Sequence, residues 1–330
     1  MHGMIGLHNS VIRSTGCSVP SRVVPNEWFT NYVDTSDEWI RSRTGIRERR
    51  FVGPGESSAT LGVTAAKLAL ESSDLHPEDI DLIICATVTP ENMCPQNAAV
   101  IHAALGCRPI PAFDLSAACT GFLYAMSIAD QFLKTGAARH VLIVGSDVLS
   151  RTLDFTDRNS CILFGDGAGA AILSASPQRE RGVHSVKIYA DGGPRELIHV
   201  PGLVTPQPPA DQKQHEHIRL NGREVFKFAV RRMIELTTDA ILECRLAGRS
   251  IDLLIPHQVN QRIIDAALES TGFPSDRVMV NLEKYGNTSA ASVPIALDEA
   301  LKTGRAKPGD TLLLVAFGGG LTWGSAIVTL

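Results

Sequence analysis

The stretch LKTGAARHVLIVG at residues 133–145 decides the fold, because its first four letters recur as LKTG at residues 301–304. Each copy precedes an apolar run typical of a buried strand, VLIVG at 141–145 and LLLVAFG at 312–318. Self-similarity at a fixed offset is the sequence signature of an internal duplication. The chain is therefore predicted to contain two copies of one α/β unit.

A second pair of matching segments lies further upstream in each copy. IDLI at 80–83 matches IDLL at 251–254, at an offset of 171 residues instead of 168. Each follows an apolar-periodic segment predicted to be helical, at 59–72 and about 228–247. We interpret the three-residue change in offset as a difference in loop length.

The duplication relates two polar residues that have the chemistry of a catalytic site. Cys119 and Asn287 each stand fourteen residues before an LKTG copy, and each opens an Ala/Ser-rich segment predicted to be helical. The sequence thus predicts that they occupy equivalent places in the two halves. Packing about a pseudo-twofold axis would bring both of them next to His257, which follows the second IDLL strand.

Composition restricts the classes of protein that remain. A chain of 330 residues with 44% hydrophobic and 20% charged residues is typical of one large or two medium globular domains. The net charge of −4 gives no reason to expect nucleic acid or a membrane surface as a partner. No apolar run of about 18 residues occurs and the N-terminal segment lacks an apolar signal region, so we expect a soluble cytoplasmic protein.

Cysteine spacing argues against a disulfide framework and against a zinc site. The seven cysteines are an odd number and contain no CxxC pair, so no metal site is expected. The polar, proline-containing stretch 191–220 is predicted to be a loop or lid. The predicted strands are 81–88, 141–147, 169–175, 252–257 and 311–317, and the predicted helices are about 59–72, 95–105, 120–135, 222–246, 259–270 and 288–303.

Cys119 stands between small residues immediately before a predicted helix, where the helix dipole and free amide groups favour a thiolate. Each candidate also has a structural interpretation. Cys119 could be a small residue in a tight turn, His257 a hydrogen-bonding residue and Asn287 a helix N-cap. The segment GDGAGA at 165–170 is not a dinucleotide motif, and we interpret it as a turn in the sheet core.

Five segments together resemble the condensing enzymes of the thiolase superfamily, and most closely the β-ketoacyl-acyl carrier protein synthase III family. The resemblance runs from residue 35 to the C-terminus, and the three catalytic motifs occur in the family's order. It implies an α/β thiolase-like fold, in which two duplicated halves, 1–177 and 178–330, pack as a five-layered αβαβα core. The segments are DLSAACTGF at 114–122, FGDGAGAAIL at 164–173, IPHQVNQRI at 255–263, YGNTSAASVP at 285–294 and AFGGGLTWGSAIV at 316–328.

The resemblance implies an acyltransferase that starts fatty acid synthesis by joining an acyl-coenzyme A primer to malonyl-acyl carrier protein. Cys119 would be the nucleophile, and His257 and Asn287 would complete a Cys-His-Asn triad. The backbone N–H groups of Cys119 and Gly319 would form the oxyanion hole. Coenzyme A is a substrate in this scheme, and no metal or redox nucleotide is expected as a cofactor. An asparagine at 287, instead of a second histidine, is the mark of the initiating type.

The same resemblance assigns the substrate entrance. Coenzyme A would lie against six residues, and its adenine would stack between Trp39 and Arg158. The residue before Pro95 is a bulky phenylalanine in acetyl-preferring relatives and is Cys94 here, which predicts a roomier acyl pocket and acceptance of chains longer than acetyl. The six residues predicted to bind coenzyme A are Thr35, Trp39, Arg43, Arg158, Phe226 and Asn260.

Acidic acyl carrier protein is expected to dock on basic residues. Arg223, Lys227 and Arg231 recur every four residues, which places them on one helix face, and Arg262 follows His257 closely. The alternative is an ordinary solvated face, and the acidic Asp265 that follows Arg262 weakens the docking prediction. The family resemblance further implies a homodimer.

Three competing functions stay open at this point. A condensing enzyme of secondary metabolism would use the same residues on a special acyl starter. A Cys-His-Asn thioester hydrolase would use the same residue types with water as the acceptor. A non-catalytic acyl-binding protein would lack a reactive Cys119.

Overall fold

The computed structural model describes residues 9–178, 180–201 and 217–330. Elements of the first half are, in chain order with η for a 3-10 helix, β1 (Asn9–Ser18), β2 (Val23–Pro25), η1 (Asn26–Asn31), α1 (Asp37–Thr44), β3 (Glu48–Arg50), α2 (Ser58–Glu71), η2 (Pro77–Asp79), β4 (Leu82–Ala86), α3 (Asn97–Leu105), β5 (Ala112–Leu115), η3 (Ala118–Thr120), α4 (Gly121–Lys134), β6 (His140–Val148), η4 (Leu149–Thr152), α5 (Arg158–Cys161) and β7 (Asp166–Ser176).

The second half continues with β8 (Gly182–Ala190), η5 (Arg195–Leu197), β9 (Ile198–His199), β10 (Arg219–Leu220), α6 (Gly222–Leu246), β11 (Leu253–Pro256), α7 (Gln261–Thr271), η6 (Ser275–Arg277), α8 (Leu282–Tyr285), η7 (Ser289–Ala291), α9 (Ser292–Lys302), β12 (Thr311–Gly318) and β13 (Thr322–Thr329). We retain as a proposal the division into residues 1–177 and 178–330. It falls between β7 and β8.

Two sheets repeat one strand pattern. The first has the order β1-β7-β6-β4-β5, with β7 antiparallel to β1 and β6, and β4 parallel to β6 and β5. The second has the order β8-β13-β12-β11, with β13 antiparallel to β8 and β12, and β11 parallel to β12. Apart from β5, each strand of the first sheet has a counterpart in the second, which confirms the predicted duplication.

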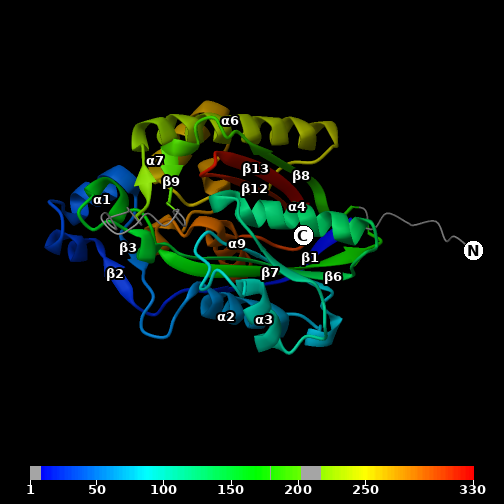
Figure 1. Cartoon of the computed structure of the whole chain (residues 1–330). Coiled ribbons are helices and arrows are strands. Elements are labelled where there is room, and N and C mark those ends of the chain that lie inside the picture. The colour runs from blue at the N-terminus through cyan, green and yellow to red at the C-terminus, as the bar shows by residue number, and fades with distance from the viewer. Residues whose placement is uncertain (1–8, 179, 202–216) are drawn as a thin grey trace, which may run out of the picture.

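The layers follow from which helices cover which sheet face (Figure 1). Helices α4 and α9 lie between the two sheets and contact both of them. Helices α2 and α3 cover the outer face of the first sheet, and α6, paired with α7, covers the outer face of the second. The five-layered αβαβα prediction is confirmed.

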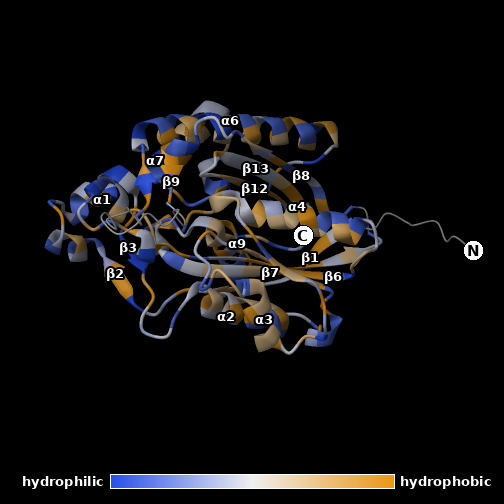
Figure 2. Ribbon diagram, in the orientation of Figure 1, coloured by the Kyte–Doolittle hydropathy of each residue, from blue (hydrophilic) through white to orange (hydrophobic). Residues whose placement is uncertain are grey.

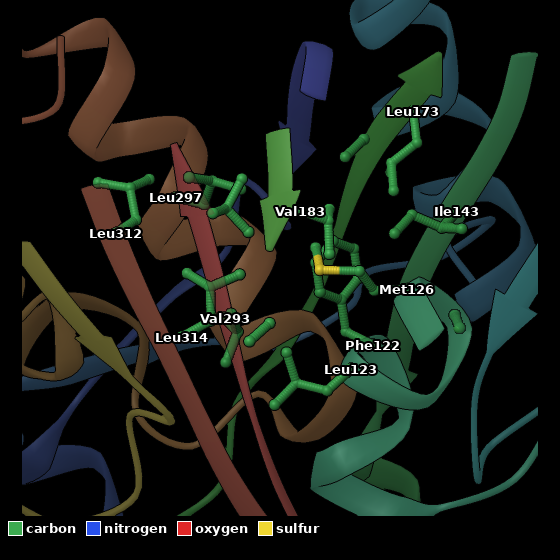
Figure 3. Packing of buried hydrophobic residues seen from close by; sticks show 14 of the residues in the cluster. Phe122, Leu123, Met126, Ile143, Leu173, Val183, Val293, Leu297, Leu312 and Leu314 are labelled. Atoms are coloured by element: carbon green, nitrogen blue, oxygen red, sulfur yellow. The ribbon is translucent and has the colours of Figure 1, made fainter. Parts of the chain in front are cut away.

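The central layer is covered by a sheet on each side, so its two helices bury side chains on both faces. Phe122, Leu123 and Met126 of α4 meet Val293 and Leu297 of α9 in one cluster of buried side chains (Figure 3). Hydrophobic residues gather on these inner elements, whereas α6 carries hydrophilic residues on its outer side (Figure 2). Each large side chain buried here contributes about 1.5–3 kcal/mol to stability.

The predicted equivalence of Cys119 and Asn287 is wrong by three residues. The turns η3 and η7 begin at Ala118 and Ser289, which have φ angles of 48° and 52°, so the position that corresponds to Cys119 is Ala290. The difference arises because α4 has 14 residues and α9 has 11. The LKTG copies mark the ends of these helices, and counting back from the ends therefore misplaces their starts. The change of offset comes from helix length, not from a loop.

Every helix and strand that was predicted occurs, within a few residues of its expected bounds. The strands that were not predicted are β1, β5, β8 and β13 of the two main sheets and the short strands β2, β3, β9 and β10, and none of them has a long uninterrupted apolar run. The segment GDGAGA was wrongly interpreted as a turn, because Asp166 onward forms β7, where α9 packs so closely that side chains would not fit.

The prediction of a loop at 191–220 is only partly correct. Residues 202–216 lie outside the described residues, and the described remainder contains η5 and the two-stranded pair β9 and β10. None of the helices in the described part of the chain combines the length and hydropathy that a membrane crossing requires.

Candidate active site

A cavity of about 1720 Å³ is built by residues from both halves of the chain. Cys119 enters it from the first half, and His257, Asn287 and the glycine segment 318–320 enter it from the second. His257 directly follows β11 and Gly318 ends β12, whereas Cys119 lies in η3 after β5 and Asn287 lies between α8 and η7. The three predicted catalytic residues therefore line one cavity.

Cys119 is held in a turn whose backbone leaves little freedom. Ala118, directly before it, has a φ of 48°, a conformation that costs an ordinary residue about 1–3 kcal/mol. Gly318 packs against it so closely that an added Cβ would lie 2.7 Å from the backbone nitrogen of Cys119. The turn thus depends on a strand of the opposite half.

The thiol is protonated in this cavity, contrary to the expectation of a thiolate. Burial raises the pKa of Cys119 to about 12, although a hydrogen bond with the Ser289 side chain lowers it. The charge of Asp147 acts in the same direction as burial. Loss of solvation outweighs the favourable position at a helix start, so the thiol must lose a proton before it can act as a nucleophile.

His257 follows β11 and is 1% exposed. Burial lowers the pKa of His257 to about 3, so the imidazole is neutral at physiological pH. Its ring stands edge-on to Phe317 at 5.7 Å between centroids, and Nδ1 has no hydrogen-bond partner among the described residues. The neutral ring can donate one hydrogen bond to a substrate oxygen from its other nitrogen.

Asn287 is anchored by its backbone to the first half of the chain. Its N–H donates to the carbonyl of Leu163 at 2.9 Å, and its own carbonyl accepts from Gly165 N–H at 2.9 Å. The side-chain Oδ1 accepts from the backbone N–H of Ser289 at 2.9 Å. With Oδ1 occupied, the Nδ2 amino group is the part of the side chain available as a donor to the cavity.

Four of the six residues predicted to bind coenzyme A line this cavity. Trp39, Arg43, Phe226 and Asn260 line it. Arg158 stacks directly on Trp39, with its guanidinium carbon 4.6 Å from the ring centroid. An adenine would need a gap of about 7 Å, because each stacked layer takes about 3.5 Å. Arg158 would therefore have to move for the predicted adenine stack to form.

Asn260 and Thr35, both predicted to bind coenzyme A, differ in their hydrogen bonds. Asn260 caps α7 by accepting from Arg262 N–H at 2.9 Å and donates to the carbonyl of Arg43 at 3.1 Å. Thr35 is absent from the lining of the cavity, and its buried hydroxyl has no partner among the described residues. The roles of both in binding coenzyme A stay predictions.

The basic residues predicted to dock a carrier protein lie around the entrance of the cavity. Arg223, Lys227 and Arg262 line it, and Arg231 lies further along α6. Lys227 pairs with Glu224 at 2.8 Å, and Arg231 pairs with Glu235 at 4.0 Å. Two of the three basic residues on this face of α6 are thus partly neutralised by the same helix.

Cys94 and Gly319 were predicted to shape the acyl pocket and the oxyanion hole. Cys94 is exposed and precedes a cis peptide bond to Pro95, next to a second cavity of about 340 Å³ that is lined by Met93 and Gln96. Both cavities share the lining residues Val88 and Ser116. Gly319 lines the catalytic cavity beside Gly318.

The sequence analysis missed three buried residues that hold this site. Gln258 donates to the carbonyls of Pro256 and Met279 and accepts from two backbone N–H groups, which ties the segment of His257 to residues 279–282. Ser289 lowers the pKa of Cys119, and the charge of Asp147 raises it. A carboxylate at the end of the apolar run VLIVGSD was the available signal for Asp147.

No group of three or more His, Cys, Asp or Glu side chains suited to holding a metal ion occurs within residues 9–178, 180–201 and 217–330.

Comparison with known proteins covers nearly the whole chain. Residues 113–192 match the 3-oxoacyl-[acyl-carrier-protein] synthase III family, and residues 242–330 match the C-terminal part of that family. A curated relative from Sphingopyxis alaskensis, named β-ketoacyl-[acyl-carrier-protein] synthase III, is 46% identical over 320 residues, which cover 97% of this chain and 98% of the relative.

Solved structures of similar proteins agree with this assignment. The 3-oxoacyl-[acyl-carrier-protein] synthase III of Aquifex aeolicus has a TM-score of 0.90 and 44% identity, covering 97% of this chain and all of that one. The priming β-ketosynthase of the R1128 polyketide pathway has a TM-score of 0.87 and 33% identity, covering 98% of this chain and 96% of that one. By its sequence and by its fold, this chain belongs to the β-ketoacyl-[acyl-carrier-protein] synthase III family.

Proposed function

We propose that the protein is an acyltransferase that condenses an acyl-coenzyme A primer with malonyl-acyl carrier protein to give a 3-oxoacyl-acyl carrier protein. This is the step that begins fatty acid synthesis. The observation that carries the proposal is the single cavity lined by Cys119, His257 and Asn287, in a chain that belongs to the synthase III family. The alternative of a special starter in secondary metabolism has weaker support, because the polyketide enzyme is 33% identical to this chain and the Sphingopyxis alaskensis relative is 46% identical.

In the first half-reaction, Cys119 would take the acyl group from coenzyme A. A cysteine thiolate exchanges readily with a thioester, and the product is an acyl-Cys119 that keeps the acyl group bound. The tetrahedral oxyanion would be held by the N–H groups of Cys119 and Gly319. The close contact of Gly318 with Cys119 supports this assignment, because it brings the glycine segment to the reacting sulfur.

In the second half-reaction, loss of carbon dioxide from the malonyl thioester leaves an enolate that needs hydrogen-bond donors. His257 is neutral and Asn287 has a free amino group, so each can donate one hydrogen bond to the enolate oxygen. Removing one donor of this kind costs about 2.7–4 kcal/mol of transition-state stabilisation. The carbanion then attacks the acyl carbonyl and releases Cys119. These steps require a nucleophile and hydrogen-bond donors, and no metal or redox nucleotide enters them.

The substrate would enter from the side of the molecule on which α1, α7 and β9 lie (Figure 1). Coenzyme A would bind Trp39, Arg43, Arg158, Phe226 and Asn260 there, with Thr35 behind them. Carrier protein would dock on the basic residues Arg223, Lys227, Arg231 and Arg262, which suits its acidic surface. The exposure of all four residues supports the docking proposal, as does the place of Arg223, Lys227 and Arg262 in the lining of the cavity.

We also propose that the enzyme is a cytoplasmic homodimer in which Cys94 of one copy borders the acyl pocket of the other. Strand β5 is an edge strand of the first sheet, and Met93 beside it is 75% exposed. An unpaired edge next to exposed apolar residues is a ready surface for a second copy. The small Cys94 would leave room for acyl chains longer than acetyl.

The deciding test is intact mass after mixing the protein with acyl-coenzyme A thioesters from acetyl to decanoyl, with Cys119→Ala as the control. The proposal expects an adduct that depends on Cys119 and no further turnover until malonyl-acyl carrier protein is added. Repeated turnover without malonyl donor would identify a hydrolase instead. No adduct with any thioester, together with no alkylation by iodoacetamide, would identify a binding protein.

Cys94→Phe provides the matched control for chain length. The proposal expects this variant to lose adducts of eight or more carbons while it retains the acetyl adduct. Equal adduct formation across the panel in both proteins would reject the role of Cys94.

A further inference from the structure

Arg49 is a fully buried arginine without a carboxylate partner. It lies on β3 and is 0% exposed. None of the ion pairs within residues 9–178, 180–201 and 217–330 includes it. Burial lowers the pKa of Arg49 to about 9, so the guanidinium still carries its charge at physiological pH. Burying a charge without a counter-charge is costly, and this arginine therefore calls for a reason.

The guanidinium of Arg49 is bonded to neutral oxygens on two sides. Nη1 donates to Asn26 Oδ1 at 2.8 Å and to the carbonyl of Val24 at 3.3 Å. Nη2 donates to the carbonyl of Ile162 at 2.5 Å. The guanidinium carbon also lies 4.5 Å from the ring centroid of Phe29. The two ends of the guanidinium thus join the chain at β2 and η1 to the residue that follows α5.

Asn26 anchors the guanidinium on the first of these sides. It is 0% exposed, and its Nδ2 donates to Asp37 Oδ1 at 2.8 Å and to the carbonyl of Ile46 at 2.7 Å. Its Oδ1 is the atom that accepts from Arg49. Because Asn26 is tied to the start of α1 and to the chain before β3, the guanidinium has a fixed frame on this side.

The second side of Arg49 leads to Asn287. Ile162 accepts from the arginine, and the carbonyl of the next residue, Leu163, accepts from the N–H of Asn287 at 2.9 Å. Two residues further along, the N–H of Gly165 donates to the carbonyl of Asn287 at 2.9 Å. Segment 162–165 therefore holds both backbone groups of Asn287 and is itself held by Arg49.

The stem of Arg49 packs against both of the paired backbone segments. A Cβ added to Gly165 would lie 3.1 Å from the Cβ of Arg49, and one added to Gly286 would lie 3.3 Å from it. Gly286 directly precedes Asn287 and has a φ of 64°. Arg49 thus lies against a glycine in each segment, so a shift of its side chain reaches the backbone of Asn287.

We propose that Arg49 is a positioning residue that sets the place of the Asn287 side chain in the catalytic cavity, by holding segment 162–165 against the backbone of Asn287. The inference rests on the proposed function and assigns Arg49 to the decarboxylation half-reaction, in which Asn287 donates to the enolate. Arg49 is absent from the lining of the cavity, so it acts through Asn287. Stability alone does not require the cation, since an apolar residue of similar volume often stabilises a buried site equally well.

The first test needs no substrate, so it is independent of the proposed function. Hydrogen exchange at the amides of Gly165 and Asn287 is followed by mass spectrometry. The proteins compared are the wild type, Arg49→Met and the control Arg232→Met. Arg232 also stacks on an aromatic ring, 4.1 Å from a ring centroid of Trp323, and its buried Nε likewise has no partner among the described residues. It lies on α6 and is absent from the lining of the cavity.

The proposal expects both amides to exchange about tenfold faster or more in Arg49→Met, because the backbone pairing that protects them loses its support. Exchange at the same amides should be unchanged in Arg232→Met. Wild-type exchange rates in Arg49→Met would overturn the proposal, as would an equal acceleration in the two variants.

The second test separates the half-reactions. Arg49→Met should form the acyl adduct on Cys119 at a rate close to wild type. Carbon dioxide release from malonyl thioester should slow by about 10–10²-fold, since a misplacement of about 1 Å in a catalytic group has a cost of this size. Equal loss in both half-reactions, or loss in neither, would reject the proposal. Failure of wild-type acylation would reject the proposed function and leave the exchange test in force.

A double variant tests whether Arg49 acts through Asn287. In the Asn287→Ala background, Arg49→Met should slow condensation by less than about twofold, because the donor that Arg49 positions is already absent. Losses that multiply in the double variant would show that Arg49 acts by another route and would overturn the proposal.

Arg49→Lys guards against a variant that does not fold, and the thermal midpoint of each variant is measured first. Lysine keeps the charge, but its single ammonium group does not reproduce the fork with which the guanidinium bonds on two sides. If Arg49→Met does not fold, Arg49→Lys should show the same faster exchange and slower decarboxylation, and wild-type behaviour of Arg49→Lys would then overturn the proposal. Failure of both variants to fold would also overturn it, because the arginine would then serve the fold as a whole.

Discussion

The turn that carries Cys119 and the turn that begins at Ser289 share one backbone design and differ in what they present. Each starts with a non-glycine residue at positive φ, forms a short 3-10 helix and leads into a central helix. Each also packs against a glycine of the opposite half, Gly318 against Cys119 and Gly145 against Ala290. The first turn presents a thiol to the cavity, and the second presents the Ala290 N–H group to Asp147.

The duplicated scaffold supplies two turns with the same strained backbone, and only the first of them places a thiol in the cavity. Ala290 is 1% exposed and is absent from the lining of the cavity, whereas Cys119 lines it. Position in the repeat alone therefore does not create a reactive residue.

Moving the thiol between the two turns should have the largest effect. The double variant Cys119→Ala/Ala290→Cys is expected to lose condensation by about 10³-fold or more, because a sulfur at 290 has no access to the cavity. Steady-state condensation and intact mass after acyl-coenzyme A treatment measure this. An acyl adduct on the transplanted cysteine would show that the two turns are interchangeable.

Removing the hydrogen-bond donors of the second half should have the next largest effect. Asn287→Ala is expected to slow condensation by about 10²–10³-fold, since the enolate loses one donor. Acylation of Cys119, followed by intact mass, should continue. Arrested acylation would mean that the second half also activates the thiol through Asn287. His257→Ala serves as the parallel variant.

Replacing the glycine that packs against each turn by alanine tests how much each close contact contributes to the stability of the fold. Gly318→Ala would place Cβ 2.7 Å from the Cys119 nitrogen, and Gly145→Ala would place it 2.2 Å from the Ala290 carbonyl oxygen. Each is expected to lower the free energy of unfolding by about 1–3 kcal/mol through overpacking. Denaturant unfolding measures this, with Gly192→Ala as the control because nothing lies within 4 Å there. Unchanged stability in both variants would show that neither contact matters.

Acidic pH should lower the free energy of unfolding, because the unfolded chain protonates His257 more readily than the folded protein does. Because the pKa of His257 falls to about 3 in the folded protein, the unfolded chain binds one more proton between that pH and about 6.5. Stability should therefore rise with pH in this window, by about 1 kcal/mol per pH unit from this group. Denaturant unfolding of the wild type and His257→Gln from pH 4 to 7 checks this, and parallel curves would contradict it.

Charge reversal at the cavity entrance should have the smallest effect. Arg262→Glu is expected to raise KM for malonyl-acyl carrier protein several-fold, and salt should reduce the difference. Arg231→Glu, whose arginine already pairs with Glu235, should change KM less. A larger effect from Arg231 would place the docking surface further along α6.

Much of the fold could be predicted from the sequence because its signals are local. Uninterrupted apolar runs identify β4, β6 and β12, and the repeated LKTG segment identifies the duplication. Those runs are long because these strands are covered on both faces. Strands β8 and β13 were missed because polar residues interrupt their apolar runs.

The candidate active site has features that local sequence motifs do not predict. Motif letters were enough to select Cys119, His257 and Asn287, which line one cavity in the structure. They could not show that burial keeps the Cys119 thiol protonated, because desolvation depends on atoms from both halves. Nor could they show that Arg158 stacks directly on Trp39.

The amino-acid sequence was enough to predict the duplicated α/β architecture, the family and the three residues that line one cavity. The three-dimensional arrangement was needed to show that Ala290 corresponds to Cys119 and that Asp147 of the first half accepts a hydrogen bond from the Ala290 N–H group of the second. The physical reason is that the length of a helix and the surroundings of a buried charge depend on packing between distant segments, which a linear pattern does not record.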